Sequence, residues 1–354
     1  MRMLLILLLF TGHALAQEWP SRPVKFIVSQ APGTSPDITA RLIADRLAKL
    51  WNQQVVVENR PGGQNVPGAQ AAARSAPDGY NFFYATTAAI VSNPVTFKSL
   101  PYDPAKDFVP VAMIAKSPMV IAVNPSVPAK TLAELVALDK SQPGKLAAAN
   151  EGAKTFSGMM SQLLNLSAGM QLLQVPYNGV SPAILDTVAG RTQVVLVSSA
   201  ALLPAIKRGE LRPLAVSAGK RVRGLEEVPT LSETYPGFEY VGWFALLAPA
   251  GTPAAVVQRV NRDMDRVLTD PEMAQRLHDF GLVNEGAGTP DSLNEFLRAE
   301  RERWAKLVKE IGLQPELSSR LHGAAGSEPN SLRSRYTTTA SVSSAAPAST
   351  KPIS

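Results

Sequence analysis

The sequence predicts an α/β fold in which a mostly parallel sheet is covered by helices and the chain forms two lobes. Short apolar segments of about four to six residues alternate with helix-length segments, which is the rhythm of βαβ units. Roughly 300 residues lie between a predicted leader and a low-complexity tail, which is enough for two lobes of ordinary size. The chain contains no cysteine, so packing and not disulfides must stabilise its core.

The predicted elements follow from this alternation of apolar segments and turn residues. Strands are expected at residues 24–28, 55–57, 82–85, 119–123, 172–175, 194–197, 214–217 and 244–248. Helices are expected at residues 38–50, 132–138, 156–166, 183–189 and 201–207. Near the C-terminus, Thr252-Pro253, Asp270-Pro271 and Thr289-Pro290 each place a proline beside a capping residue, and they predict the starts of three more helices.

Both ends of the chain are expected to lie outside the fold. Arg2, the apolar residues 4–10 and the small residues Ala14-Leu15-Ala16 are typical of a secretory signal peptide covering residues 1–16. We therefore expect the mature protein outside the cytoplasm. Residues 316–354 are rich in serine, threonine, alanine and proline and show no apolar periodicity, so we expect a disordered tail.

The inventory of reactive side chains favours a binding protein over an enzyme. The formal net charge is +6, but no basic run with interleaved aromatic residues indicates nucleic-acid binding. His13 lies in the leader and His322 in the tail, and His278 is expected near a helix end as a partner of the helix dipole. The sequence has no nucleophile elbow, no Walker loop and no metal-ligand spacing. We therefore expect no catalytic residue, no metal and no cofactor.

A strand followed by a loop of small residues forms the first candidate site. The stretch SQAPGTSPDITARL, residues 29–42, follows the first predicted strand. Ser35 is expected to be the N-cap and Pro36 the first helical residue, with Asp37 in the first turn, where the helix dipole favours a carboxylate. Gly33 allows a backbone geometry or a close approach that a Cβ would block. A helix N-terminus with free N–H groups at a strand end is suited to an anion.

The same pattern recurs in the second half of the chain. The stretch LLQVPYNGVSPAILDTVAG places Asn178 and Gly179 after a strand and Ser181-Pro182 at the expected start of a helix. One such loop is ordinary, because any βα unit needs a helix cap. Two of them in different lobes favour a cleft with anion-receptive faces on both sides, since ligands of open α/β sheets bind at the carboxyl ends of strands.

A series of motifs covers nearly all of the expected fold, from about residue 19 to residue 312. In order, they are WPSRPVKFIV, APGTSPDITARLIADRL, VVVENRPGG, APDGYNFFYATT, LPYDPAKDFVPVAMIAKSP, VPYNGVSPAILDTVAG, GELRPLAVSAGKR, EEVPTLSETYPGFE and LLAPAGTPAAVVQRVN. This series resembles the Bug-type extracytoplasmic solute receptors, which are the periplasmic substrate-binding components of tripartite tricarboxylate transporters.

The resemblance implies a two-lobed periplasmic binding protein of the Venus-flytrap type, with a small carboxylate in the cleft between the lobes. Lobe 1 is expected to comprise residues 17–117 and 241–315, and lobe 2 residues 118–240. The hinge is expected near residues 116–120 and 240–243. The implied protein is a monomeric receptor in the periplasm that delivers its ligand to membrane transporter subunits.

The resemblance also implies a set of ligand-binding residues. In the family, backbone N–H groups and hydroxyls hold most of the carboxylate, with ordered waters on the first lobe. The matching positions here are Ala31, Pro32, Gly33, Thr34, Ser35, Asp37, Thr86 and Thr87 on lobe 1 and Thr155, Ser157, Asn178, Gly179 and Ser181 on lobe 2. Two departures touch this site: Thr34 replaces a common second glycine, and Phe156 stands where many members carry a His-Leu pair. The identity of the acid therefore does not follow from the resemblance.

An alternative role is ligand sensing, in which the receptor presents its bound carboxylate to a signalling partner instead of a permease. Both roles need the same cleft, so the sequence does not separate them. An enzyme that uses this cleft for chemistry is disfavoured, because the required histidine, cysteine and metal sets are missing from the sequence.

Overall fold

The computed structural model of the protein describes residues 19–315. The predicted signal peptide, residues 1–16, and the predicted disordered tail, residues 316–354, lie outside the described residues.

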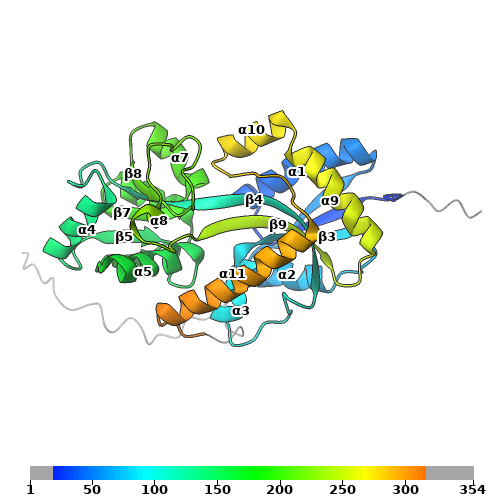
Figure 1. Cartoon of the computed structure of the whole chain (residues 1–354), viewed down its shortest axis with the longest axis horizontal. Coiled ribbons are helices and arrows are strands. Elements are labelled where there is room, and N and C mark those ends of the chain that lie inside the picture. Colours follow the sequence, from blue (N-terminus) through cyan, green and yellow to red (C-terminus); the bar gives the residue numbers. More distant parts are fainter. Residues whose placement is uncertain (1–18, 316–354) are drawn as a thin grey trace, which may run out of the picture. The chain divides into compact units, whose positions relative to one another are not determined.

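A mixed sheet forms the framework of the fold (Figure 1). Its strands are β1 (Val24–Val28), β2 (Val55–Asn59), β3 (Asn81–Thr86), β4 (Phe108–Val123), β5 (Ala147–Asn150), β6 (Leu173–Pro176), β7 (Val194–Ser198), β8 (Arg212–Val216) and β9 (Val241–Pro249). They lie in the order β2-β1-β3-β9-β4-β7-β5-β6, and β8 pairs with β4. Every strand expected from the sequence is present, and β5, which is mostly alanine, is additional.

The helices that cover this sheet include all those expected from the sequence. They are α1 (Ser35–Trp51), α2 (Val66–Ala73), α3 (Asn93–Thr96), α4 (Leu132–Ser141), α5 (Phe156–Ala168), α6 (Val180–Val188), α7 (Ser199–Lys207), α8 (Leu231–Thr234), α9 (Ala254–Leu268), α10 (Pro271–Asp279) and α11 (Pro290–Glu310). A short 3-10 turn, η1 (Gly63–Asn65), precedes α2, and a π-helical turn, η2 (Ala88–Ser92), follows β3.

The expected mostly parallel sheet is wrong in part. The pairings of β1 with β2 and β3, and of β5 with β6 and β7, are parallel. The pairings of β9 with β3 and β4, and of β4 with β7 and β8, are antiparallel. Two parallel groups of βαβ units are therefore joined by antiparallel strands. The alternation of apolar segments in a sequence does not reveal strand direction, so this arrangement was not predictable from it.

The long strand β4 connects the two parallel groups. Its residues 108–118 pair with β9, and from Met119 onward it pairs with β7 and β8 instead. The sequence predicted only residues 119–123 of this strand, because Pro110 and Pro118 are unusual inside a strand. The ladder with β9 shifts its register beside Pro110, which accommodates the missing donor.

Two apolar cores lie on either side of this change of partner. The first surrounds β1, β3, β9 and the beginning of β4 and includes the fully buried Phe26 and Leu246 beneath α1 and α9. The second surrounds β7 and the end of β4 and includes Val120 and Val197 beneath α6 and α7. Each core can therefore support its own group of strands.

Two helix starts near the predicted site differ from expectation. The N-cap of α1 is Thr34, and Ser35 is already helical. The N-cap of α6 is Gly179, so the helix begins before Ser181. Each helix therefore begins one or two residues before the proline that was expected to be its first residue. Proline is tolerated within the first turn because the N–H it lacks would have no helical partner there.

The starts of the C-terminal helices are largely as predicted. Asp270 accepts hydrogen bonds from the first turn of α10, and Thr289 forms a capping box at α11. Thr252 was expected to cap α9, but its hydroxyl donates to the Pro249 carbonyl (2.7 Å) and Pro253 takes the N-cap position.

A strained turn joins β2 to α2. Four consecutive residues have positive φ: Gly62 (+111°), Gly63 (+44°), Gln64 (+50°) and Asn65 (+73°). A positive φ costs conformational free energy in a residue with a Cβ, and the glutamine side chain offsets little of that cost. The Asn93 Nδ2 donates to the Gln64 carbonyl (2.7 Å) and holds the turn against the segment that follows β3.

Replacing Gln64 by glycine is expected to stabilise the protein. Glycine adopts a φ of +50° without a Cβ clash, and the bond from Asn93 goes to a main-chain carbonyl that the variant keeps. We expect the free energy of unfolding in urea to rise by about 1 kcal/mol. The matched control Gln70→Gly, inside α2, should lower it by about 1 kcal/mol. A loss of equal size in both variants would show that Gln64 is not strained.

Candidate functional site

The loop between β1 and α1 is the first part of the predicted site. Gly33 has a φ of +81°, a region that favours glycine, and no described atom lies within 4 Å of where its Cβ would be. The Thr34 hydroxyl donates to the Ala31 carbonyl (2.7 Å), so it is turned back into the loop. Ala31 and Pro32 are exposed. The loop therefore presents its main chain at Gly33 to open space.

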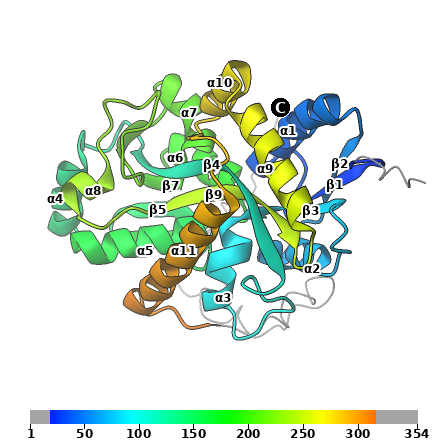
Figure 2. The ribbon, with the colours of Figure 1, turned by 45° about the vertical axis from the view of Figure 1, so that its right-hand side comes forward.

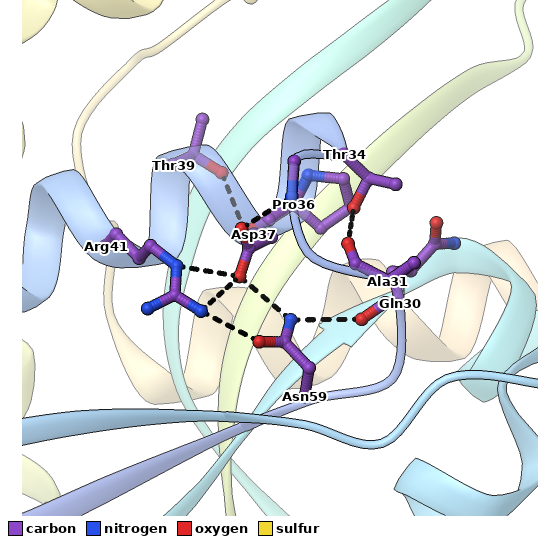
Figure 3. Close-up of polar contacts among 9 residues, drawn as sticks. Gln30, Ala31, Thr34, Pro36, Asp37, Thr39, Arg41 and Asn59 are labelled. Atoms are coloured by element: carbon purple, nitrogen blue, oxygen red, sulfur yellow. Dashed lines mark hydrogen bonds and ion pairs between the residues drawn. The ribbon is translucent and has the colours of Figure 1, made fainter.

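Asp37 supports this loop from inside the protein (Figure 3). It is 3% exposed. One carboxylate oxygen accepts from the Gly33 N–H (2.8 Å), and the other accepts from Arg41 Nε (3.0 Å) and Asn59 Nδ2 (2.8 Å). Asn59 Nδ2 also donates to the Gln30 carbonyl (3.0 Å). Both oxygens of Asp37 are thus engaged in holding the loop, and its contact with a ligand stays a prediction.

The surroundings of Asp37 keep its carboxylate charged. Burial by itself raises the pKa, but the hydrogen bonds from Arg41, the Gly33 N–H and Asn59 outweigh it, so the pKa of Asp37 lies below its ordinary value. The charged form accepts these bonds more strongly than a neutral acid would. The loop is therefore fixed by a charge whose own partners are all within the protein.

The N-terminus of α1 is open at this loop. Thr34, its N-cap, makes no capping bond through its side chain to any described residue. The first N–H groups of a helix have no partner within the helix, and together with the helix dipole they favour an anion. Ser35 and Asp37 supply these N–H groups, because Pro36 has none.

Three buried hydroxyls without a partner stand at the ends of neighbouring elements here. Within residues 19–315, six buried side-chain polar atoms lack a hydrogen-bond partner. Three of them are the hydroxyls of Ser29, which follows β1, Ser35, which begins α1, and Thr86, which ends β3. Since β1 and β3 are parallel neighbours, their carboxyl ends lie side by side. Buried polar groups are nearly always hydrogen-bonded, so each of these hydroxyls marks a position for a polar ligand or ordered water.

Thr87, the next predicted residue, has a different environment from Thr86. Its hydroxyl accepts the Trp243 N–H (2.8 Å) and lies 3.4 Å from the Trp243 carbonyl. The side chain of Thr87 therefore ties the end of β3 to the start of β9.

The loop between β6 and α6 carries the second predicted face. Gly179, with a φ of +152°, is the N-cap of α6 and offers no side chain to close the helix end. Asn178 and Ser181 are exposed beside it, and Pro182 stands in the first turn. This end has the same construction as the start of α1: an open helix N-terminus, here with two exposed polar side chains.

The segment before α5 is constructed differently. The Thr155 hydroxyl accepts the Gly158 N–H (3.2 Å) and donates to the Gly152 carbonyl (2.8 Å), and Ser157 Oγ accepts the Glu151 N–H (2.9 Å). Thr155 and Ser157 thus hold their own loop and cap α5. Burial raises the pKa of Glu151. The N-terminus of α5 is less suited to an anion than those of α1 and α6.

Strand directions turn the two open helix ends toward one another. Because β1 and β3 are parallel and β9 is antiparallel to both β3 and β4, the strands β1 and β3 run in the direction of β4, toward the second core. The strand β7 is antiparallel to β4, and β5 and β6 run parallel to β7. The strands β5 and β6 therefore run back toward the first core. The carboxyl ends of both groups, and the loops that carry the predicted residues, therefore point to the middle of the sheet.

Sequence reasoning missed two residues that the structure adds to this site. Ser29 follows β1, and Asn59 ends β2. Polar residues at the ends of neighbouring strands were a visible signal for both. The sequence predicts Arg41 as solvated or salt-bridged and not as a ligand contact, and the structure pairs it with Asp37 (2.9 Å).

Other features of the described residues do not compete with this site. An open surface pocket of about 490 Å³ lies between the ends of α5 and α11, and none of the predicted site residues lines it. In the described part of the chain, no group of three or more acidic, histidine or cysteine side chains could hold a metal ion. None of the helices between residues 19 and 315 has the length and apolar character needed to cross a membrane.

Comparison with known proteins gives the same assignment as the motifs. Residues 39–313 match the tripartite tricarboxylate transporter family receptor. The chain is 33% identical to the protein BugT of Bordetella pertussis over 299 residues, which cover 84% of this chain and 91% of BugT. Among solved structures, R. palustris Rpa4515 with adipate has a TM-score of 0.77 at 32% identity and covers 84% of this chain and 100% of that one. MatC from Rhodopseudomonas palustris with bound malate has a TM-score of 0.71 at 29% identity and covers 82% and 100%.

These matches confirm the resemblance to Bug-type receptors and the two-lobed α/β fold that it implied. The chain belongs to the receptor family of tripartite tricarboxylate transporters.

Proposed function

We propose that this protein is an exported periplasmic receptor that binds a small carboxylate between its lobes and delivers it to membrane transporter subunits. The observation that carries the proposal is the open N-terminus of α1, together with the unpartnered hydroxyls of Ser29, Ser35 and Thr86 at the carboxyl ends of β1 and β3 and the start of α1. A helix end of this kind favours an anion, and the hydroxyls can donate further hydrogen bonds to it. The adipate and malate bound in the related structures indicate dicarboxylates as the first class to test.

In this proposal the ligand lies between two faces. Lobe 1, residues 17–117 and 241–315, contributes the main chain from Ala31 to Asp37. Lobe 2, residues 118–240, contributes Asn178, Gly179 and Ser181. Asp37, Thr87, Thr155 and Ser157 act mainly by fixing these loops, since their polar atoms are engaged within the protein. The receptor works as a monomer and performs no chemistry on its ligand.

A thermal-shift screen of mature protein tests the proposal. The panel contains mono-, di- and tricarboxylates, including adipate and malate, and the uncharged diamide of each diacid as the matched control. A ligand that binds only the folded state adds about 2.7 kcal/mol of stability at a hundredfold excess over its dissociation constant, which is readily measured. We expect at least one dicarboxylate to raise the melting temperature while its diamide does not. A panel in which no acid exceeds the effect of added salt contradicts carboxylate binding.

Asp37→Asn is expected to destabilise the first loop and weaken binding of the acid identified in the screen. The asparagine NH2 would face donors from Arg41 or Asn59, and the charged acceptor would be lost. We expect a loss of about 1.5–3 kcal/mol in unfolding free energy at pH 7. Because the pKa of Asp37 is lowered in the folded protein, its contribution is present above the unfolded value and disappears as the pH falls through the folded one. The difference between wild type and variant should therefore shrink in acid.

The control for this prediction is Asp45→Asn on the same helix. Asp45 pairs with Lys49 (2.8 Å), but both side chains are more than half exposed. Such a pair contributes about 0–1 kcal/mol, so this variant should unfold and bind like wild type. An Asp37 variant as stable as the Asp45 variant, with unchanged affinity, would show that the loop does not depend on Asp37.

Asn178→Ala and Ser181→Ala are expected to weaken ligand affinity about ten- to a hundredfold each, because a hydrogen bond to a charged group contributes about 1.5–3 kcal/mol. Both side chains are exposed at the start of α6, so the unfolding free energy should not change. Isothermal titration calorimetry with the acid found in the screen measures the effect. Asn294→Ala, an exposed change on α11, is the control. Unchanged affinity in the double variant of Asn178 and Ser181 would place the ligand elsewhere.

A further inference from the structure

The helix α11 contacts elements of both groups of strands. It packs against β4, α3 and η2, and also against α5, which follows β5. Figures 1 and 2 show it running obliquely to β4 and β9 and extending toward α5, which it contacts. A rigid helix that touches both lobes restricts how they move relative to one another.

A buried carboxylate on α11 joins two tryptophans. Glu300 is 3% exposed. Its Oε2 accepts the indole N–H of Trp243 (3.3 Å) and that of Trp304 (3.4 Å), and its Oε1 lies 3.2 Å from Arg303. Arg303 in turn donates to the Glu239 carbonyl (2.7 Å), in the segment leading into β9. Burial raises the pKa of Glu300, consistent with its position beneath both indoles.

One of these tryptophans is bonded to the end of β3. Trp243 stands near the start of β9, and its main-chain N–H donates to the Thr87 hydroxyl (2.8 Å). Its ring is fully buried and packs edge-on against Phe296 of α11 (5.8 Å between ring centroids). Trp243 therefore fixes α11 to the first group of strands beside the proposed ligand site.

The other tryptophan reaches the second group of strands. The ring of Trp304 lies 5.3 Å from that of Phe156 and 6.4 Å from that of Tyr240, measured between centroids. Phe156 is the first residue of α5, between Thr155 and Ser157. A Cβ at Gly242 would lie 3.3 Å from the Phe156 ring, so β9 also approaches this contact closely. Trp304 therefore presses on lobe 2 at the base of its candidate loop.

We propose that Glu300, Trp243 and Trp304 form a hinge anchor, in which Glu300 is a positioning residue that sets the relative arrangement of the two lobes. By accepting from both indoles, Glu300 holds Trp304 against Phe156 and fixes one end of the contact to β9. Removing the acceptor leaves two buried N–H groups without a partner and frees the Trp304 ring. The lobes then sample a wider range of separations. We make this inference on the basis of the proposed function, since it assumes lobes that close on a ligand.

The absence of cysteine from the sequence makes the lobe separation directly measurable. Cysteines introduced at the exposed positions Arg262 in α9 and Ala137 in α4 are the only thiols, and spin labels on them report the distance distribution between the lobes. The measurement is made on mature protein without ligand. We expect Glu300→Leu to broaden the distribution and shift its mean, and Glu300→Gln, which keeps an acceptor, to restore the wild-type distribution.

A second indole–carboxylate pair supplies the matched control. Trp51 donates to Asp263 (2.7 Å), and both residues lie within the first group of elements. Asp263→Leu should lower the unfolding free energy without changing the distance distribution. If Glu300→Leu fails to fold, Phe156→Ala, at a partly exposed position, should broaden the distribution in the same way.

Three results would overturn the proposal. The first is a wild-type distribution in a folded Glu300→Leu or Phe156→Ala variant. The second is an equal change in Asp263→Leu. The third is a Glu300→Gln variant whose distance distribution is changed as much as that of Glu300→Leu. This would show that the hydrogen bonds from the indoles do not set the lobe arrangement. Because no ligand is present, these outcomes do not depend on whether a carboxylate binds.

Discussion

The antiparallel pairing of β4 with β9 is the constraint on which the arrangement of the protein depends. β9 joins β4 to β3, and β4 continues past Met119 to join β7 and β8. If these strands were parallel to their neighbours, the carboxyl ends of the two βαβ groups would point in the same direction. Because they are antiparallel, the ends of β1 and β3 face those of β5 and β6. In the proposed receptor, two helix N-termini of similar construction then serve one ligand.

A single buried charge prepares one of these helix ends. Asp37 accepts from Gly33, Arg41 and Asn59, so the nearest arginine is committed to a loop-supporting role. Removing this carboxylate would leave its donors unpaired and cost about 1.5–3 kcal/mol of stability. The result is a loop whose shape is fixed before ligand arrives, with its main chain open at Gly33. Preorganisation of this kind lowers the conformational-entropy cost of binding, because the loop does not have to become ordered.

Much of the fold was predictable, because strands such as β1 and β7 are short apolar segments between turn residues. Strand direction was not predictable, since it depends on long-range pairing. The first part of β4 was not predictable either, because Pro110 and Pro118 are unusual inside a strand. The candidate site residues were predicted from the strand-loop-helix pattern and from the family resemblance. Their roles were less predictable: Thr155 and Thr34 look alike in sequence, but only Thr155 caps its helix.

In the proposed receptor, the strength of binding depends on closure as much as on contacts. A helix N-terminus contributes about 0.3–1 kcal/mol toward an exposed anion and up to about 2 kcal/mol when partly buried. Either open helix end alone is therefore a weak site. A ligand between α1 and α6 gains both, and it gains more as closure removes water, since electrostatic interactions strengthen in a drier environment. In the proposed receptor, the free energy that separates open from closed lobes therefore enters the affinity directly. A contact far from the ligand, such as the Trp304 ring against Phe156, can thus adjust affinity without altering a single donor in the site.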